Sequence, residues 1–271
     1  MSMLLTKTLN IFAYIGAGVL KRLSGINSLC YLSVDAAKGS LTAGAWPRTT
    51  RDVLVRQLLF TGIEAVPLIS LMALLAGISV VAQAQMWLNR IGETDMLGPL
   101  MILVLFREFG PLLVNFVVIG RSGTAMATEL ANMKVNNEVS LLTAQGIDPT
   151  GYLVMPRVVG MMLSVFCLSV VFVTVSILVG YLSAVMLGIT TAGPSDFFAG
   201  ILKGLTAGDL LTLLAKTLIP GLFSGTIACY EGLAVAGSIN EVPRAATRAV
   251  VKSIAALITI TALIAVLSYA R

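Results

Sequence analysis

Five long apolar stretches, separated by polar segments, run through the sequence from residue 66 onward. They cover residues 66–82 with an extension through Trp87, then 96–120, 158–187, 210–230 and 254–270. A helix crosses the hydrocarbon core of a bilayer with roughly 20 residues, so each stretch predicts a transmembrane helix. The third is uncharged over its whole length and must tilt or project from the bilayer. The pattern therefore predicts an all-α membrane protein with five transmembrane helices.

Composition excludes several other classes of protein. The chain is 57% hydrophobic and only 11% charged, against roughly 25% charged residues in a soluble domain. There is no histidine, and the three cysteines are far apart, so the sequence predicts no metal site and no catalytic residues. The net charge is +5, but the basic residues do not cluster with aromatic ones. A nucleic-acid partner is therefore not expected.

The basic residues instead indicate the orientation in the membrane. With the N-terminus in the cytoplasm and five crossings, thirteen of the 18 Lys and Arg residues lie on the cytoplasmic side and three on the other. Short cytoplasmic loops carry the excess of Lys and Arg in membrane proteins. We therefore expect a multi-pass membrane protein with a cytoplasmic N-terminus and a C-terminus on the opposite side of the membrane.

The segment before the first span is predicted to form a separate part of the chain, residues 1–53. Its apolar run, residues 8–20, lies between Lys7 and the pair Lys21–Arg22 and is short for a crossing. Such a segment is typical of a helix lying in the membrane interface. A sixth span and a signal peptide are the alternatives, and the role of residues 25–50 stays open. Residues 54–271 are predicted to form the five-span domain.

Three charges lie inside the predicted spans. Arg107 and Glu108 are adjacent in the second span, and Lys216 lies in the fourth. An ionised residue at a helix centre costs roughly 2.5–3.5 kcal/mol on insertion scales, so these side chains must face protein or water. Adjacent helical residues point about 100° apart, so Arg107 and Glu108 cannot both face one cavity. We expect one to line a cavity and the other to pair within the subunit, with a purely structural pair as the alternative.

The longest polar interval between spans predicts an amphipathic helix over residues 122–146. Apolar side chains recur at helical spacing at Met126, Leu130 and Met133. Gly146 suits the end of a helix, and Asp148 followed by a proline suits the start of the third span. Such a helix either rests on the membrane surface or docks a cytoplasmic partner, and the residues alone favour neither.

Several motifs in this part of the chain resemble those of a known family. "GRSGTAMATELANMKV" and "GIDPTGYLVMPRVVG", with "REFGPLL", "ACYEGL" and "PRAATRAVV" in order, are similar to the MlaE (YrbE) permeases, the membrane subunits of ABC-type MCE lipid transporters. The resemblance implies a homodimer of five-span subunits, a cytoplasmic ABC ATPase dimer docked on the amphipathic helix, and a periplasmic MCE-domain protein. A small cytoplasmic accessory protein is a further candidate partner. The implied cargo is phospholipid.

The resemblance also implies roles for particular residues. Glu108 would line the cavity near the lipid head group, and Lys216 would either pair with it, meet a lipid phosphate or extend towards the interface. The apolar wall would be the face of the first span with i, i+7, i+8, i+11 spacing, which could equally be ordinary packing. Its members are Val80, Trp87, Leu88 and Ile91.

The expected docking residues for the ATPase lie on the amphipathic helix: Glu129, Leu130, Met133, Lys134 and Glu138. Arg107, Arg244 and Arg248 are structural or head-group candidates, and simple anchoring at the cytoplasmic surface explains the last two equally well. The chain has no G-x-x-x-x-G-K-[ST] motif, so it is predicted to bind no cofactor itself and to rely on a partner for ATP hydrolysis.

Two positions depart from the family pattern. Thr261 stands where members often carry an aspartate in the last span, and Glu231 follows "CY" where an apolar or aromatic residue is usual.

Three rival functions stay open beside the phospholipid transporter. They are transport of another hydrophobic molecule such as a sterol, ion-coupled transport through Glu108 and Lys216, and a membrane scaffold without transport.

Overall fold

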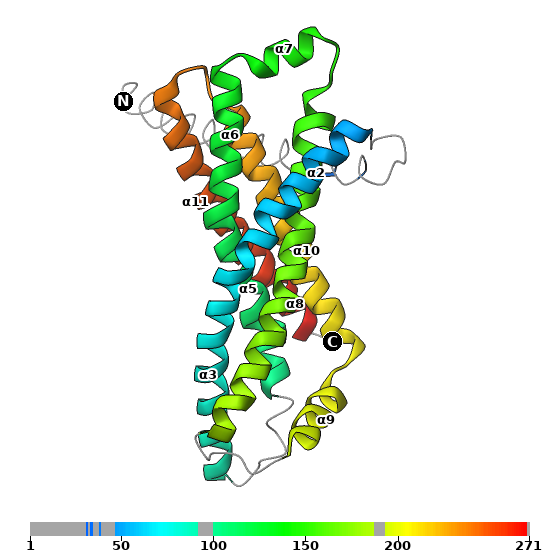
Figure 1. Cartoon of the computed structure of the whole chain (residues 1–271), viewed down its shortest axis with the longest axis vertical. Coiled ribbons are helices and arrows are strands. Elements are labelled where there is room, and N and C mark those ends of the chain that lie inside the picture. Colours follow the sequence, from blue (N-terminus) through cyan, green and yellow to red (C-terminus); the bar gives the residue numbers. More distant parts are fainter. Residues whose placement is uncertain are drawn as a thin grey trace, which may run out of the picture.

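The computed structural model describes residues 47–91, 100–186 and 193–269, together with residues 31, 33, 34 and 38. Within these ranges every regular element is a helix, and five helical stretches are long and apolar enough to cross a membrane (Figure 1). The prediction of an all-α membrane protein with five spans is therefore confirmed. The expected interfacial helix at residues 8–20 lies outside the described residues.

Several spans are built from more than one helical element. The first span contains α2 (Arg48–Thr61), the short η2 (Ile63–Ala65) and α3 (Val66–Ile91). The second contains η4 (Ile102–Phe109), α5 (Gly110–Val118), η5 (Ile119–Gly123) and α6 (Thr124–Val135), and the third contains η6 (Thr150–Val154) and α8 (Met155–Met186). The fourth is α10 (Ala207–Leu233), and the fifth contains η7 (Ile239–Glu241) and α11 (Val242–Tyr269). Two shorter helices, α7 (Glu138–Ala144) and α9 (Pro194–Gly204), lie at opposite ends of the bundle (Figure 1).

The helices are longer than a bilayer requires. The second stretch runs unbroken over 34 residues and the third over 37, whereas roughly 20 residues cross the hydrocarbon core. The more polar helices of the first and second spans, α2 and α6, lie towards the end of the bundle that carries α7 (Figure 1). The helical length beyond that of a membrane span therefore lies mainly at the α7 end.

Helix α8 forms the centre of the bundle, where it packs against α3, α10, α2 and α5. Its side chains Phe172 and Leu168 belong to the largest buried apolar cluster. Small residues let neighbouring helices approach closely, as is common in membrane proteins. At Gly77 of α3, a Cβ atom would lie only 2.2 Å from the carbonyl oxygen of Ser176 on α8. The α3–α8 contact therefore depends on a glycine at this position.

We expect Gly77→Ala to destabilise the protein by about 1–3 kcal/mol, because overpacking forces the two backbones apart. The measurement is the midpoint of thermal unfolding of the detergent-purified chain. Gly120→Ala is the matched control, since a Cβ at Gly120 would meet nothing within 4 Å. Equal unfolding midpoints for the two variants would contradict the role of this contact.

The connection between the second and third spans differs from the prediction of one helix over residues 122–146. Helix α6 continues the second span to Val135, and α7 begins at Glu138. Between them Asn137 has a φ of 61°, a left-handed conformation that asparagine tolerates better than most residues. The predicted continuous helix is therefore wrong in extent, because this backbone conformation interrupts it.

The other predicted boundaries in this connection are confirmed. Gly146 follows α7 with a φ of 77°. The carboxylate of Asp148 accepts hydrogen bonds from the backbone N–H groups of Thr150 at 3.1 Å and Gly151 at 2.8 Å. Asp148 therefore caps the start of the third span, as its position before Pro149 predicts.

Candidate functional site

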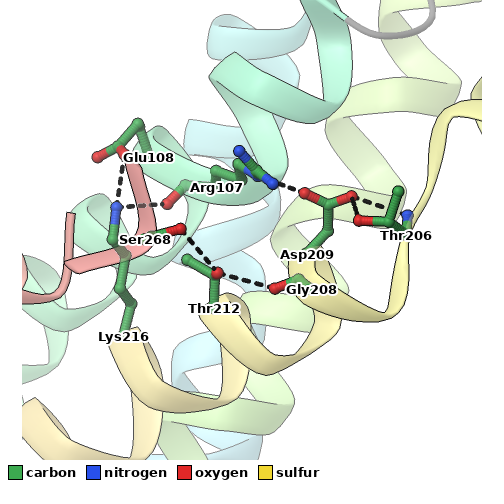
Figure 2. A network of polar contacts seen from close by, with 8 residues as sticks. All are labelled: Arg107, Glu108, Thr206, Gly208, Asp209, Thr212, Lys216 and Ser268. Carbon is green, nitrogen blue, oxygen red and sulfur yellow. Dashed lines mark hydrogen bonds and ion pairs between the residues drawn. The ribbon is translucent and has the colours of Figure 1, made fainter. Parts of the chain in front are cut away.

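The two adjacent charges of the second span lie on η4, a π-helical segment that ends just before Pro111. Proline cannot donate a backbone hydrogen bond, and π-helical segments inside α-helices are frequent at functional sites. The backbone of the second span is therefore irregular just before Pro111. It presents Arg107 and Glu108 towards different parts of α10 (Figure 2).

Glu108 pairs with Lys216 of α10. The ammonium of Lys216 donates to a carboxylate oxygen of Glu108 at 2.5 Å and to the carbonyl oxygen of Arg107 at 3.0 Å (Figure 2). Lys216 is only 1% exposed, whereas the side chain of Glu108 is 39% exposed. The expected pairing of the two residues is thus present, and the carboxylate keeps an open side.

Arg107 pairs with Asp209 in the first turns of α10 (Figure 2). The other carboxylate oxygen of Asp209 accepts hydrogen bonds from the backbone N–H of Thr206 at 2.8 Å and from its hydroxyl at 2.7 Å. This is a capping box, in which a side chain three residues into the helix binds back to the capping residue. Sequence reasoning missed Asp209, although a threonine three residues before an acidic residue is the signal for this motif.

Arg107, Glu108, Asp209 and Lys216 together form what we call the α10 charge cluster. It contains two acidic and two basic side chains and so is neutral as a whole. Pairing with hydrogen bonds is what makes charges tolerable in a low-dielectric environment. The last turn of α11 lies close by, since the hydroxyls of Thr212 and Ser268 are 3.3 Å apart (Figure 2). The cluster lies in the half of the bundle nearer α9.

A second set of ion pairs lies near the α7 end. Glu231 of α10 is buried and accepts hydrogen bonds from Arg248 at 2.9 Å and Lys252 at 2.5 Å, both on α11. Arg244, Arg248 and Lys252 line an open groove of about 550 Å³ on α11. Glu231, a departure from the family pattern, therefore joins the fourth and fifth spans. At the other departure, Thr261 donates only to the carbonyl oxygens of its own helix.

We expect Glu231→Gln to destabilise the chain by about 1–3 kcal/mol, because it removes charged hydrogen bonds while the half-exposed Arg248 and Lys252 can regain water. Thermal unfolding in detergent measures the loss. Arg244→Gln removes a charge from the same helix outside these pairs and should leave the midpoint unchanged. A Glu231→Gln variant as stable as wild type would show that the pairs contribute nothing.

The predicted apolar wall of the first span is divided in the structure. Leu88 is buried in a cluster with Val81, and Val80 packs against the same cluster. Trp87 instead is 63% exposed, with the Arg90 guanidinium 5.5 Å from its ring centre. The side chain of Ile91 lies outside the described residues. These side chains therefore do not form one open face in this structure, because their spacing spreads them over an arc of which part faces the core; a role in binding lipid stays a prediction.

The residues predicted to dock the ATPase lie in different environments. Leu130 is fully buried and Met133 packs against the same core, so their apolar stripe faces the bundle and offers no surface to a partner. Glu129 is exposed but bound to Arg157 at 2.9 Å. Lys134 is half-buried and Glu138 is exposed on α7.

A further exposed apolar residue lies on α7. Leu141 is 60% exposed and is not among the docking residues that the sequence predicts. Its neighbours Val139 and Leu142 face the core. Of the apolar residues on α7, Leu141 is therefore the one that presents a large surface at this end of the bundle.

Comparison with known proteins gives a consistent result. The family model described as Permease MlaE matches residues 54–267. A probable ABC transporter permease protein of Rickettsia typhi is 27% identical over 245 residues, which cover 90% of this chain and 92% of that protein. A probable ABC transporter permease protein of Synechocystis is 28% identical over 214 residues, covering 78% and 79%.

A plant protein also matches. Protein TRIGALACTOSYLDIACYLGLYCEROL 1, chloroplastic, of Arabidopsis thaliana is 29% identical over 203 residues, which cover 74% of this chain and 57% of that protein. The family match spans most of the chain, and the five apolar helices agree with a multi-pass membrane transporter subunit. The chain belongs to the MlaE permease family.

Proposed function

We propose that this chain is the transmembrane subunit of an ABC transporter that moves phospholipid between the bacterial inner membrane and a periplasmic MCE protein. Two copies form a lipid cavity at their interface, and a cytoplasmic ATPase dimer drives the cycle. The chain carries no bond-making chemistry of its own. The α7 end faces the cytoplasm, in agreement with the excess of Lys and Arg on that side.

The observation that carries the proposal is the open side of Glu108. The exposed residues that follow it, Phe109, Leu112 and Phe116, recur at helical spacing and form an apolar face. A carboxylate facing lipid tails beside such a face is costly, so a polar group must meet it there. A chamber between two subunits that holds a lipid head group at Glu108 and acyl chains along the apolar face meets both requirements.

The cargo is argued from chemistry and from a relative. An anionic carboxylate repels a phosphate, but it accepts hydrogen bonds from an amine or hydroxyl of a head group. The Arabidopsis relative is named after a glycerolipid. The name favours a glycerolipid over a sterol-like molecule, and the carboxylate favours a head group that carries an amine.

The coupling route is the long helix of the second span. A movement of α7 acts on α6, which continues through η5 and α5 to η4 and Glu108. The two π-helical segments, η4 and η5, are positions where such a helix bends. ATP binding in the partner would thus change the shape of the cavity and its affinity for lipid.

Native mass spectrometry of the purified chain tests the cargo. We expect phospholipid bound to the wild type and roughly a tenfold loss of the bound fraction in Glu108→Gln, because the amide lacks the charge that strengthens the hydrogen bond. Asp52→Asn removes an exposed carboxylate from α2 and serves as the matched control. A bound sterol or aromatic compound, or no bound molecule at all, would contradict the phospholipid cargo.

Ion-coupled transport is the second candidate, favoured by the close contact between Glu108 and Lys216, because such a pair can exchange a proton. Proteoliposomes separate the two candidates. Lipid movement that needs ATP and the ATPase supports the first, and movement that needs only a proton gradient supports the second.

A further inference from the structure

A cavity of about 410 Å³ lies near the α7 end, away from the α10 charge cluster, between α2, α6 and α8. Its apolar lining includes Val53, Phe60 and Met126, and its charges come from Arg56, Glu129 and Arg157. Nothing in the proposed transport route uses this cavity. It is large enough to admit a charged group of several heavy atoms.

Arg157 is the buried charge of this cavity. The residue is 6% exposed, and one guanidinium nitrogen donates to Glu129 at 2.9 Å. The other terminal nitrogen, Nη1, is buried and has no hydrogen-bond partner among the described residues. A buried unpaired donor on a charged group costs free energy, so Nη1 favours a ligand that brings an acceptor into this cavity.

The position of the surrounding groups restricts that acceptor. Phe60 is held in place by Arg121, which donates to its carbonyl oxygen at 2.8 Å and lies over its ring at 4.8 Å. Arg121 is further fixed by Glu64 at 2.8 Å. Phe60, part of the apolar wall, is therefore held in place by neighbouring side chains. The charged groups that can bind a ligand in the cavity are Arg56, Glu129 and Arg157.

The charged side chains of the lining indicate a ligand that carries both a negative and a positive charge. Arg56 and Arg157 outnumber Glu129, so the lining favours an anion, and guanidinium groups match the geometry of phosphate oxygens well. A simple anion would also meet repulsion from the neighbouring carboxylate. A phosphate that carries an ammonium a few bonds away satisfies all three charges, with the phosphate at the arginines and the ammonium at Glu129.

We propose that this cavity binds a phosphoethanolamine group, a phosphate diester or monoester that carries a primary ammonium. The cavity lies at the α7 end of the bundle, among the polar parts of α2 and α6, where a lipid head group and a soluble metabolite can both reach it. This site is separate from Glu108, and neither it nor the transport proposal depends on the other.

The test is binding of short-chain lipids to the full-length chain purified in detergent. Dihexanoyl phosphatidylethanolamine, phosphatidylglycerol and phosphatidylcholine are titrated alongside soluble O-phosphoethanolamine. We expect phosphatidylethanolamine to bind most tightly, because phosphatidylglycerol lacks the ammonium and phosphatidylcholine has no N–H donor. Comparable affinity for O-phosphoethanolamine identifies a soluble source, and much weaker affinity identifies the lipid.

Variants make the assignment specific. Arg56→Gln should weaken phosphatidylethanolamine and phosphatidylglycerol alike by about tenfold, the size of one charged hydrogen bond. Glu129→Gln should remove the preference between the two lipids. Arg51→Gln changes an exposed arginine on the same helix outside the lining and should change nothing.

Arg56 and Glu129 are exposed, so both variants should fold even if changes to the buried Arg157 do not. Equal affinity of the wild type for all three lipids, or an unchanged affinity in Arg56→Gln, would overturn the proposal. Loss of binding in Glu108→Gln with no loss in Arg56→Gln would also overturn it, because the bound lipid would then occupy the transport cavity.

Discussion

Lys216→Met should abolish lipid transport and destabilise the chain by about 3 kcal/mol, because it leaves the carboxylate of Glu108 without its partner. Methionine keeps an unbranched apolar side chain of similar length, so the packing of the buried stem is retained. The variant loses the hydrogen bonds that the Lys216 ammonium donates to the Glu108 carboxylate at 2.5 Å and to the carbonyl oxygen of Arg107 at 3.0 Å. An unpaired carboxylate would move towards water and no longer hold its place in the cavity.

Two further variants separate the possible causes of a loss of transport and stability. Lys203→Met removes an exposed lysine from α9 and should transport normally. The double variant Glu108→Gln with Lys216→Met removes both charges and should recover stability, since no unpaired charge remains. If Glu108 only fixes the helix register, the double variant will also recover transport, and a wild-type rate in proteoliposomes containing the ATPase would end the proposed head-group role.

Leu141→Glu should reduce association with the ATPase by at least tenfold, because it places a charge at the most exposed apolar point of α7, and burying an unpaired charge in an interface is costly. The change should not affect folding, since the side chain is 60% exposed. The measurement is the amount of P-loop ATPase that co-purifies with the tagged permease from its native membrane. Size-exclusion chromatography of each variant checks that it is folded.

The control is Ile239→Glu, which changes an exposed apolar residue at the same end of the bundle. It lies in the connection between α10 and α11, outside the proposed docking helix. Full retention of the ATPase by Leu141→Glu would place the docking surface elsewhere. Equal loss in both variants would show that α7 is not the specific contact.

The parts of the fold that the sequence predicts are those set by local chemistry. Apolar length fixes the five spans, and the cost of charge in a membrane predicts that Glu108 and Lys216 each have a polar partner, with their mutual pairing as one of the alternatives. Gly146 and Asp148 mark boundaries because their conformational and capping preferences are local. The break at Asn137 was missed since asparagine is compatible with both a helix and a left-handed turn.

The contacts that the sequence did not predict are between residues far apart in the chain. Arg157 was counted only as a basic residue near the cytoplasm, yet it pairs with Glu129 from another span. The apolar stripe containing Leu130 was assigned to a partner, but α10 and α11 cover it. Periodicity shows that a helix has an apolar face and does not say which surface covers that face.

The neutrality of the α10 charge cluster has a consequence for energetics across the membrane. A potential of 100 mV does about 2.3 kcal/mol of work on each elementary charge that crosses it. With two positive and two negative side chains held together by ion pairs, a movement of the cluster as one body displaces no net charge. A movement of this cluster should therefore not depend on the membrane potential.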